Sequence, residues 1–282
     1  MIPSALSAIV PTLGRSPLLV PCLEALKREG AEVILIDQAE PAVALPPGLA
    51  DRVLRPGRNL GFAAATNLGI AEASGDWIAT VNDDAVVEPG WAAALTAALE
   101  GDSKAAAAQG VNLLFDRPEL ADGCGIAWNG WGQAVQIGHG KPAPGAEAGI
   151  REVFGVSATA AVYRRAALRE AGAFDERLGS YYEDVDLAVR LRAAGWRALL
   201  VPAARARHAG SATGGTMSRE RWRLIYGNRY RVAARHLGAG FWPRLPLMAA
   251  RDVIDLGRAV LSGDGGRAAG IVSGWGRALT GH

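Results

Sequence analysis

Two adjacent carboxylates, Asp83 and Asp84, follow an apolar run in the segment DWIATVNDDAVV, residues 76–87. Burying neighbouring acids at the end of a strand is unfavourable unless water, a cation or a helix N-terminus receives their charge. Carboxylate oxygens are ligands that hard divalent cations prefer, so a cation is one of the three possibilities. Asp37 ends a second β-branched run, AEVILID, in the same way.

These acids must be positioned by the elements that precede them. The patterning predicts strands at residues 6–13, 31–37 and 76–83, and helices at residues 16–30, 60–75 and 89–101. Such alternation is typical of an α/β fold with a mostly parallel, Rossmann-like sheet and helices on both faces. Ligands bind beyond the carboxyl ends of the strands in these sheets, so Asp37 and the Asp83–Asp84 pair are expected at one rim.

The rest of the chain is less regular. Residues 116–150 are rich in Gly, Pro and Trp and predict short strands and a loop. A strand followed by a helix is expected at 154–168, a helix at 183–195, and a strand with an irregular tail at 196–213. From Ser218 on, aromatic and aliphatic residues recur at helical spacing, with Arg at most other positions.

Charge divides the chain into two parts. Residues 1–204 hold 24 Asp and Glu and 17 Lys and Arg, whereas residues 205–282 hold 13 Arg and four Asp and Glu. We therefore expect a catalytic-type domain over residues 1–215 and a basic, Arg- and aromatic-rich helical appendage over residues 216–282.

Bulk composition excludes several classes of protein. With 282 residues, 50% hydrophobic and 21% charged, the chain is expected to be globular and not disordered. Its two cysteines, Cys22 and Cys124, lie far apart and predict neither a disulfide framework nor a zinc cluster, which favours a reducing cytoplasm. The N-terminus lacks a signal-peptide pattern, and no apolar run reaches the length of a membrane span.

Three blocks carry a family resemblance: RNLGFAAATNLGIAEASGDWIATVNDDAVVEPGW (58–91), GAFDERLGSYYEDVDLAVRLRAAGWRALLVP (172–202) and HAGSAT (208–213). In this order they resemble family 2 inverting glycosyltransferases of the GT-A fold, most closely the bacterial rhamnosyltransferase-like branch. The likeness covers roughly residues 5–213. It implies a nucleotide-diphosphate sugar donor, a divalent cation (Mg²⁺ or Mn²⁺), and a saccharide, lipid-linked or small-molecule acceptor, as in polysaccharide and cell-envelope synthesis.

The resemblance also implies contacts with the donor. Asp37 corresponds to the family's acid for the base or ribose, although capping of the following turn is an alternative. Thr12, at the end of the first strand, is a pocket candidate that could equally cap the next helix. The remaining donor-binding candidates of this region are Arg58, Asn59, Gly61 and Asn67.

Asn82-Asp83-Asp84 corresponds to the family's Asp-x-Asp-like motif. The resemblance implies that Asp84 binds the metal and that Asn82 or Asp83 contacts the sugar or ribose; a capped turn before Pro89 is the alternative. His208 falls where many relatives place a second metal ligand.

Glu183 and Asp184, at the start of a predicted helix, correspond to the family's acidic pair near the acceptor. Asp184 is the expected general base, since a carboxylate can take the proton of an acceptor hydroxyl. The helix N-terminus favours its ionised form.

Other functions remain alternatives. A nucleotidyltransferase would need a Gly-rich basic loop after the first strand, where residues 13–17 read Leu-Gly-Arg-Ser-Pro. A non-catalytic nucleotide- or carbohydrate-binding relative would be expected to lack Asp84 or Asp184. No motif supports nucleic-acid binding. The basic C-terminal helices either close over the catalytic domain or rest on an anionic membrane at its inner face.

Overall fold

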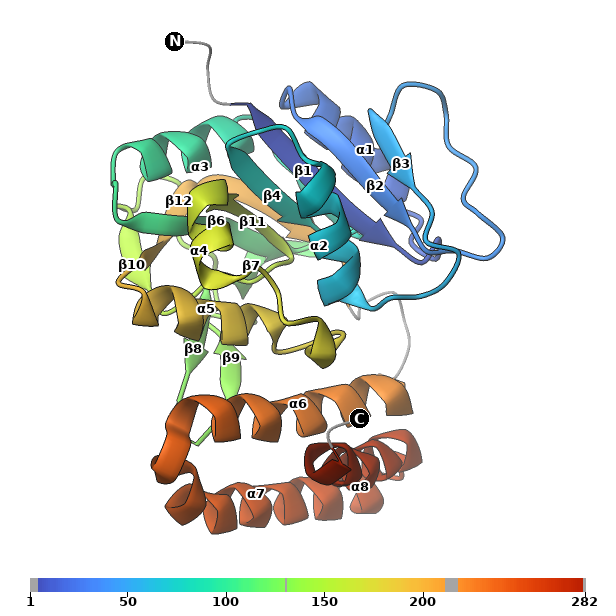
Figure 1. Ribbon diagram of the computed structural model, residues 1–282, viewed down its shortest axis with the longest axis vertical. Helices are drawn as coiled ribbons and strands as arrows, with labels where there is room; N and C mark the ends of the chain where they lie inside the picture. The colour runs from blue at the N-terminus through green and yellow to red at the C-terminus, as the bar shows by residue number, and fades with distance from the viewer. Residues whose placement is uncertain (1–4, 130, 211–217, 281–282) are drawn as a thin grey trace.

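The computed structural model describes residues 5–129, 131–210 and 218–280, as a body built on a sheet with a layer of helices beside it (Figure 1). The central sheet has ten strands in the order β10-β12-β6-β11-β4-β1-β2-β3, with β5 beside β12 and β7 beside β6. Its strands are β1 (Leu6–Thr12), β2 (Glu32–Asp37), β3 (Arg52–Leu54), β4 (Trp77–Val81), β5 (Ala85–Val87), β6 (Ala105–Leu114), β7 (Arg117–Gly123), β10 (Arg151–Val153), β11 (Ala160–Arg164) and β12 (Arg197–His208). A separate ribbon pairs β8 (Ile126–Trp128) with β9 (Ala134–Gln136).

The strands β3, β2, β1 and β4 run parallel to one another, and β12 runs parallel to β6. Strand β11 lies between β4 and β6 and is antiparallel to both. The predicted α/β fold is confirmed. Thr12 is the sheet partner of Asp37, so the acids that end or follow the parallel strands lie at one rim, as expected.

Helices cover both faces because side chains alternate along each strand. From β1, Ala8 and Val10 enter one core and Ile9 enters the other. The first core receives α1 (Leu19–Arg28) and α3 (Trp91–Glu100); the second receives α2 (Phe62–Glu72), α4 (Arg165–Ala171) and α5 (Glu183–Ala193).

The chain ends in a helical layer. It contains α6 (Arg219–Leu237), the short 3₁₀ turn η3 (Gly238–Gly240), α7 (Phe241–Leu261) and α8 (Gly265–Thr280). Helix α6 begins at Ser218, whose hydroxyl accepts the Arg221 N–H at 3.3 Å. Figure 1 shows α6 between the body and α7. The predicted domain boundary between residues 215 and 216 lies outside the described residues.

Strand β6 has no counterpart among the sequence-based expectations. Its sequence, AAAAQGVNLL, is rich in alanine, which intrinsically favours helix over strand. Pairing with β11, β12 and β7 overrides that preference, because the strand is buried from Ala105 to Leu113. A Cβ at Gly110 would lie 2.3 Å from the Ala204 carbonyl oxygen, so only glycine allows this approach to β12.

Candidate active site

A cleft of about 1430 Å³ opens beyond the carboxyl ends of β1 and β4, between the body and α6. Its volume exceeds the usual range for one drug-sized ligand, so it has room for two reactants. Most of the predicted site residues meet here: Thr12, Asn59, Gly61, Asn82, Asp83, Asp84, Glu183, Asp184 and His208 all line it.

Asp84 and His208 come together at this rim. The Nε2 atom of His208, at the end of β12, lies 3.2 Å from Oδ1 of Asp84. Pairing of β5 with β12, which sets His208 opposite Ala85, brings the two side chains into contact across 124 residues of sequence. The two residues predicted as metal ligands are therefore neighbours in the fold.

A third residue, Asp122, fixes the imidazole. Its Oδ2 lies 2.8 Å from Nδ1 of His208. Burial alone would lower the pKa of His208, but the carboxylates of Asp122 and Asp84 outweigh it and raise this pKa to about 9. No motif in the sequence points to Asp122, because its position depends on the hairpin of β6 and β7.

This arrangement fits a divalent cation, whose binding would displace the proton that the two carboxylates otherwise keep on His208. Two ligand atoms bound to one cation on perpendicular axes lie about 3 Å apart, close to the observed Asp84–His208 separation. A metal-binding histidine usually donates its other ring N–H to a carboxylate, and Asp122 occupies that position beside Nδ1 of His208. Within residues 5–129, 131–210 and 218–280, no three His, Cys, Asp or Glu side chains are grouped to hold a metal by themselves. Oxygens of a bound ligand would have to complete the coordination.

Asp83 faces the first strand instead. Its Oδ2 accepts a hydrogen bond of 2.5 Å from the Thr12 hydroxyl, and that hydroxyl accepts the Gly14 N–H at 2.9 Å. Burial raises the pKa of Asp83 to about 6. Asn82 lines the same cleft, and its backbone N–H donates to the Thr159 carbonyl at 2.8 Å. Thr12 and Asp83 thus form one hydrogen-bonded polar unit next to Asp84 in the sequence.

The loop before α5 holds an unusual backbone. Tyr181 and Tyr182 have φ of 70° and 71°, a left-handed conformation that bulky residues rarely adopt. Strain of this kind persists only where surrounding contacts enforce it, and it concentrates at functional sites. Tyr181 receives a hydrogen bond from Arg221 of α6, and the Tyr182 hydroxyl accepts the Ala134 N–H at 3.3 Å. This turn delivers the next two residues, Glu183 and Asp184, to the cleft.

Burial and hydrogen bonding act differently on Glu183 and Asp184. Burial, and then the neighbouring Asp184 charge, raises the pKa of Glu183 well above its usual range. Its Oε2 has no hydrogen-bond partner in the described part of the chain. Burial also raises the pKa of Asp184, to about 6, while the Val185 N–H, 2.8 Å from Oδ1, limits the rise. Burial therefore opposes ionisation of Glu183, while a backbone N–H supports the carboxylate of Asp184, so Asp184 is the member of the pair better suited to accept a proton.

The glycine-rich segment around Gly61 touches the same loop. Gly61 has φ of 79°, and a Cβ there would lie 3.1 Å from the backbone of Gly179. The Gly61 N–H is bound by the Asn59 side chain at 2.8 Å. At the start of α2, Phe62 N–H donates to the Ser180 hydroxyl at 3.1 Å. Residues 59–62 and 179–180 therefore form one continuous wall of the cleft.

Two predicted donor residues lie in a second, adjoining pocket of about 910 Å³. Arg58 is exposed at its edge. The carboxylate of Asp37 is fully buried: its oxygens accept the N–H groups of Ala39 and Val43, each at 3.1 Å, and Arg55 at 3.1 Å. These contacts match the alternative expectation, a turn cap, and residues 38–43 line the pocket.

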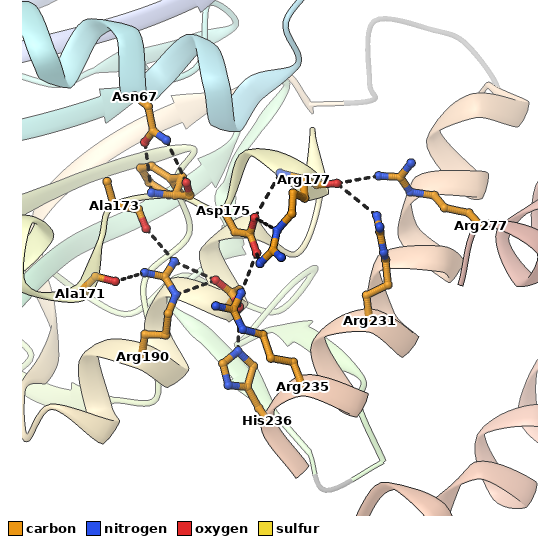
Figure 2. Close-up of polar contacts among 12 residues, drawn as sticks. Asn67, Ala171, Ala173, Asp175, Arg177, Arg190, Arg231, Arg235, His236 and Arg277 are labelled. Carbon is orange, nitrogen blue, oxygen red and sulfur yellow. Dashed lines mark hydrogen bonds and ion pairs between the residues drawn. The ribbon is translucent and has the colours of Figure 1, made fainter. Parts of the chain in front are cut away.

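Asn67 does not reach the cleft. Its amide brackets the backbone of Phe174, donating to the carbonyl oxygen at 2.8 Å and accepting the N–H at 3.1 Å, as Figure 2 shows. A third bond, of 3.0 Å, goes to Glu176. The predicted donor contact of Asn67 is therefore corrected: the phase of α2 turns this side chain toward the 174–176 segment, where it braces the loop.

Helix α6 supplies site residues that no sequence motif marked. Asn228, fully buried, directs Nδ2 at the carbonyl oxygens of Leu178 (2.8 Å), Ser180 (3.0 Å) and Tyr181 (2.8 Å). Arg277 of α8 donates to its Oδ1 at 3.2 Å. One side chain thus holds three carbonyls of the loop that leads to Glu183 and Asp184.

Arginines reinforce this attachment. Figure 2 shows Arg231 and Arg277 directed at the carbonyl oxygen of Arg177, at 3.1 and 3.0 Å. Nearby, Arg235 bridges Asp175 (2.6 Å) and Asp186 (3.2 Å). Residues 175–186 are therefore held by the C-terminal helices, and several arginines of α6 serve this purpose.

We expect Asn228→Asp to lower kcat by about 10- to 10²-fold, because an aspartate cannot donate to the three carbonyls and small displacements of a reacting group are costly. Asn228 is a positioning residue, so donor binding should be nearly unchanged. Nucleotide-sugar titration and steady-state kinetics, measured on the same preparations, separate these effects. Equal activity of the wild type and the nearly isosteric Asp variant would show that Asn228 only fills space.

The sequence is similar to that of an N-acetylglucosaminyl-diphospho-decaprenol L-rhamnosyltransferase from Mycobacterium tuberculosis. Identity is 31% over 187 residues, which covers 56% of this chain. The match spans 58% of the length of that relative, so a large part of the mycobacterial protein has no counterpart in it.

Solved structures share the fold. A mannosyltransferase from Pyrobaculum calidifontis, in complex with GDP-Man and Mn²⁺, superposes with a TM-score of 0.59 at 17% identity, covering 98% of this chain and 87% of that one. GalNAc-T7 with UDP, GalNAc and Mn²⁺ gives a TM-score of 0.61 at 15% identity, covering 81% of this chain and 47% of that one. At these identities the likeness establishes the fold alone.

The sequence also matches a family model. Residues 7–172, more than half of the chain, fit the model of glycosyl transferase family 2. This region contains the parallel strands, the glycine-rich segment and the Asn82-Asp83-Asp84 motif. With the shared fold and the geometry of the cleft, it shows that the chain belongs to glycosyl transferase family 2.

Proposed function

We propose that the protein transfers a sugar from a nucleotide-diphosphate donor to an acceptor hydroxyl, with inversion at the anomeric carbon. The observation that carries the proposal is the convergence, in one cleft, of the Asp84–His208 pair with an ionised carboxylate, Asp184, at the start of α5. A divalent cation held by Asp84 and His208 would neutralise a diphosphate, and the carboxylate of Asp184 can accept a proton. Family membership supports the same activity.

The proposed reaction is a single displacement. The acceptor oxygen bonds to the anomeric carbon as the bond from that carbon to the diphosphate oxygen breaks, and the diphosphate keeps the bonding electrons. Asp184 takes the acceptor's hydroxyl proton. A divalent cation bound by Asp84 and His208 would supply charge neutralisation for the departing diphosphate. Burial raises the pKa of Glu183 and so opposes its ionisation, which favours Asp184 as the base of the pair.

The remaining site residues act on the donor in this proposal. Thr12, Asp83 and Asn82 contact the sugar or ribose, and residues 59–61 approach the nucleotide through their backbone. Asp37 and Arg58 bound the adjoining pocket, where the base would lie.

We further propose L-rhamnose or a related hexose as the sugar and a lipid-linked saccharide as the acceptor, since the mycobacterial relative is named for both. The buried free thiols of Cys22 and Cys124 support a reducing, cytoplasmic location.

The proposal is tested with a panel of nucleotide sugars that includes rhamnose, mannose, galactose and N-acetylglucosamine donors. One or a few donors should raise the melting temperature in Mn²⁺ and much less in chelator, because a ligand that binds only the folded state stabilises it. The donor found is then assayed for transfer, and NMR of the product should show the inverted anomeric configuration. Release of pyrophosphate from a nucleoside triphosphate and a sugar phosphate would instead identify a nucleotidyltransferase and contradict the proposal.

A further inference from the structure

Helix α7 exposes an apolar face. Among its exposed residues only Arg251 and Arg258 carry charge, and all others are apolar. Trp242 is 70% exposed and Leu261 is 90% exposed. The exposed apolar residues are Trp242, Pro243, Pro246, Leu247, Ala250, Val253, Ile254, Gly257, Val260 and Leu261. At 100° per residue they fall on one continuous side of the helix, which we call the α7 outer face.

The inner face of α7 buries two carboxylates beside the apolar side chains of Met248 and Ala259. Asp252 and Asp255 are buried against α6 and α8. Asp252 lies 2.7 Å from the Arg229 guanidinium, and it accepts hydrogen bonds from Tyr230 (2.7 Å) and Trp275 (2.9 Å). A buried carboxylate with three partners fixes the rotation of the helix, so the outer face cannot turn inward without losing them. The apolar side chains are therefore held outward.

Exposed apolar patches of this extent on otherwise folded domains mark a binding surface. The charge around the α7 outer face indicates which kind of partner binds there. Residues 218–280 hold 11 Arg and four Asp and Glu. The exposed Arg251 and Arg258 stand along one edge of the outer face and share one carboxylate, Asp255, at 3.3 and 3.7 Å, so the edge keeps a net positive charge. A second copy of the chain would bring the same positive charge to the contact, whereas an anionic lipid surface complements it. No helix of the described ranges combines the length and hydropathy needed to cross a bilayer.

We propose that α7 lies in the interface of an anionic bilayer, with its outer face among the acyl chains and its arginines at the headgroups. Tryptophan at the first turn and arginines at the border are the composition of such in-plane helices. Figure 1 shows α6 between α7 and the body, and Arg221, Leu224 and Ile225 of α6 line the cleft. Docking through α7 thus leaves the cleft uncovered, one helix layer from the lipid.

This surface differs from the one expected from the basic sequence. The arginines of α6 are drawn into the protein: Arg221 binds Tyr181, Arg235 binds Asp175 and Asp186, and Arg231 binds the Arg177 carbonyl. Deleting residues 218–282, an obvious test of tail binding, would remove Asn228 and damage the cleft. Substitutions confined to the α7 outer face are the informative ones.

The test is co-sedimentation of the full chain with vesicles of phosphatidylcholine alone and of equal parts phosphatidylcholine and phosphatidylglycerol. The wild type should pellet with the anionic vesicles and be released by salt. Ile254→Gln with Leu261→Gln should lower the partition coefficient by about tenfold or more, because each removes a large apolar side chain from the lipid. Ile150→Gln, at an exposed isoleucine outside α7, is the matched control and should pellet as the wild type does.

Two outcomes would overturn the proposal. One is recovery of the wild type in the supernatant with anionic vesicles at low salt. The other is a concentration-dependent dimer, detected by light scattering, that the double variant abolishes while vesicle binding is absent; the face would then join two copies. Neither depends on the proposed transfer. Activity toward a water-soluble acceptor should be equal in the double variant and wild type, so failure of docking and failure of catalysis are distinguishable.

Discussion

Replacing Asp184 with Asn should lower the rate of sugar transfer by about 10²-fold or more, the usual contribution of a general base. The amide keeps the shape of the side chain but cannot accept the acceptor's proton. Donor binding should persist, because Asp184 lies at the start of α5 and outside the Asp84–His208 pair. The measurements are kcat from product formation and donor affinity from calorimetry.

Glu183→Gln provides the matched comparison. Burial raises the pKa of Glu183 and favours its neutral form, which an amide resembles, so the variant should retain most of its activity. If the two results are reversed, with Glu183→Gln inactive and Asp184→Asn active, Glu183 is the base and the assignment of the pair is wrong. The two variants are nearly isosteric with the wild type, so thermal melts should confirm that both fold.

The pH dependence gives a second readout of the same residue. Since the pKa of Asp184 is about 6, activity should fall about tenfold per pH unit below that value as the base is protonated. The effect of pH on the free energy of unfolding is opposite to its effect on activity. A carboxyl whose folded pKa exceeds its unfolded value favours the fold when protonated, so this contribution is lost as pH rises from 3.8 to about 6. Asp184→Asn should remove that loss, and its melting temperature at neutral pH should equal or exceed that of the wild type.

Replacing Asp84 with Asn should abolish cation-dependent activity, lowering turnover by about 10²-fold or more, because a cation beside a departing diphosphate contributes several kcal/mol. The variant loses a charged ligand and the partner of His208 Nε2. The direct measurement is Mn²⁺ binding in the presence of the nucleotide, followed by electron paramagnetic resonance, which reports on the site without requiring turnover.

Asp116→Asn is the control, since Asp116 is an exposed aspartate in the turn between β6 and β7. It should bind Mn²⁺ and transfer sugar as the wild type does. An Asp84→Asn variant whose activity still responds to Mn²⁺ and to chelator like the wild type would move the cation elsewhere and exclude Asp84 as its ligand.

Part of this site could be predicted from the sequence because its cause is local. The runs EVILID and WIATV have the composition of strands buried on both faces, and a parallel sheet brings their ends to one rim. The sequence alone therefore predicts that the acids at the ends of these runs lie at the same rim of the sheet. The turn before α2 and the start of α5 are marked by glycine and by acidic residues in the same local way.

Other parts depend on pairings distant in the sequence. Asp122 reaches His208 only because β7 pairs with β6, a strand whose alanine-rich sequence gives no local signal. Asn228 lies 47 to 50 residues from the carbonyls it binds. For α7, the periodicity identifies an apolar face, but the hydrophobic pattern by itself implies that this face is buried. The contacts of Asp252 decide that it points outward.

Because α6 and α8 hold residues 175–186, the position of the junction matters when a chimera is made from two related proteins. The family match ends at residue 172, so the proposed base, the His208 ligand and Asn228 all lie beyond it. A chimera joined after β12 would combine residues 175–186 of one protein with the C-terminal helices of another. The three carbonyls that Asn228 binds would then lose their amide donor. A junction near residue 172 transfers residues 175–186, the proposed base Asp184 and the helices α6 and α8 together. Exchange of acceptor preference between relatives should therefore succeed at that junction and fail at the later one.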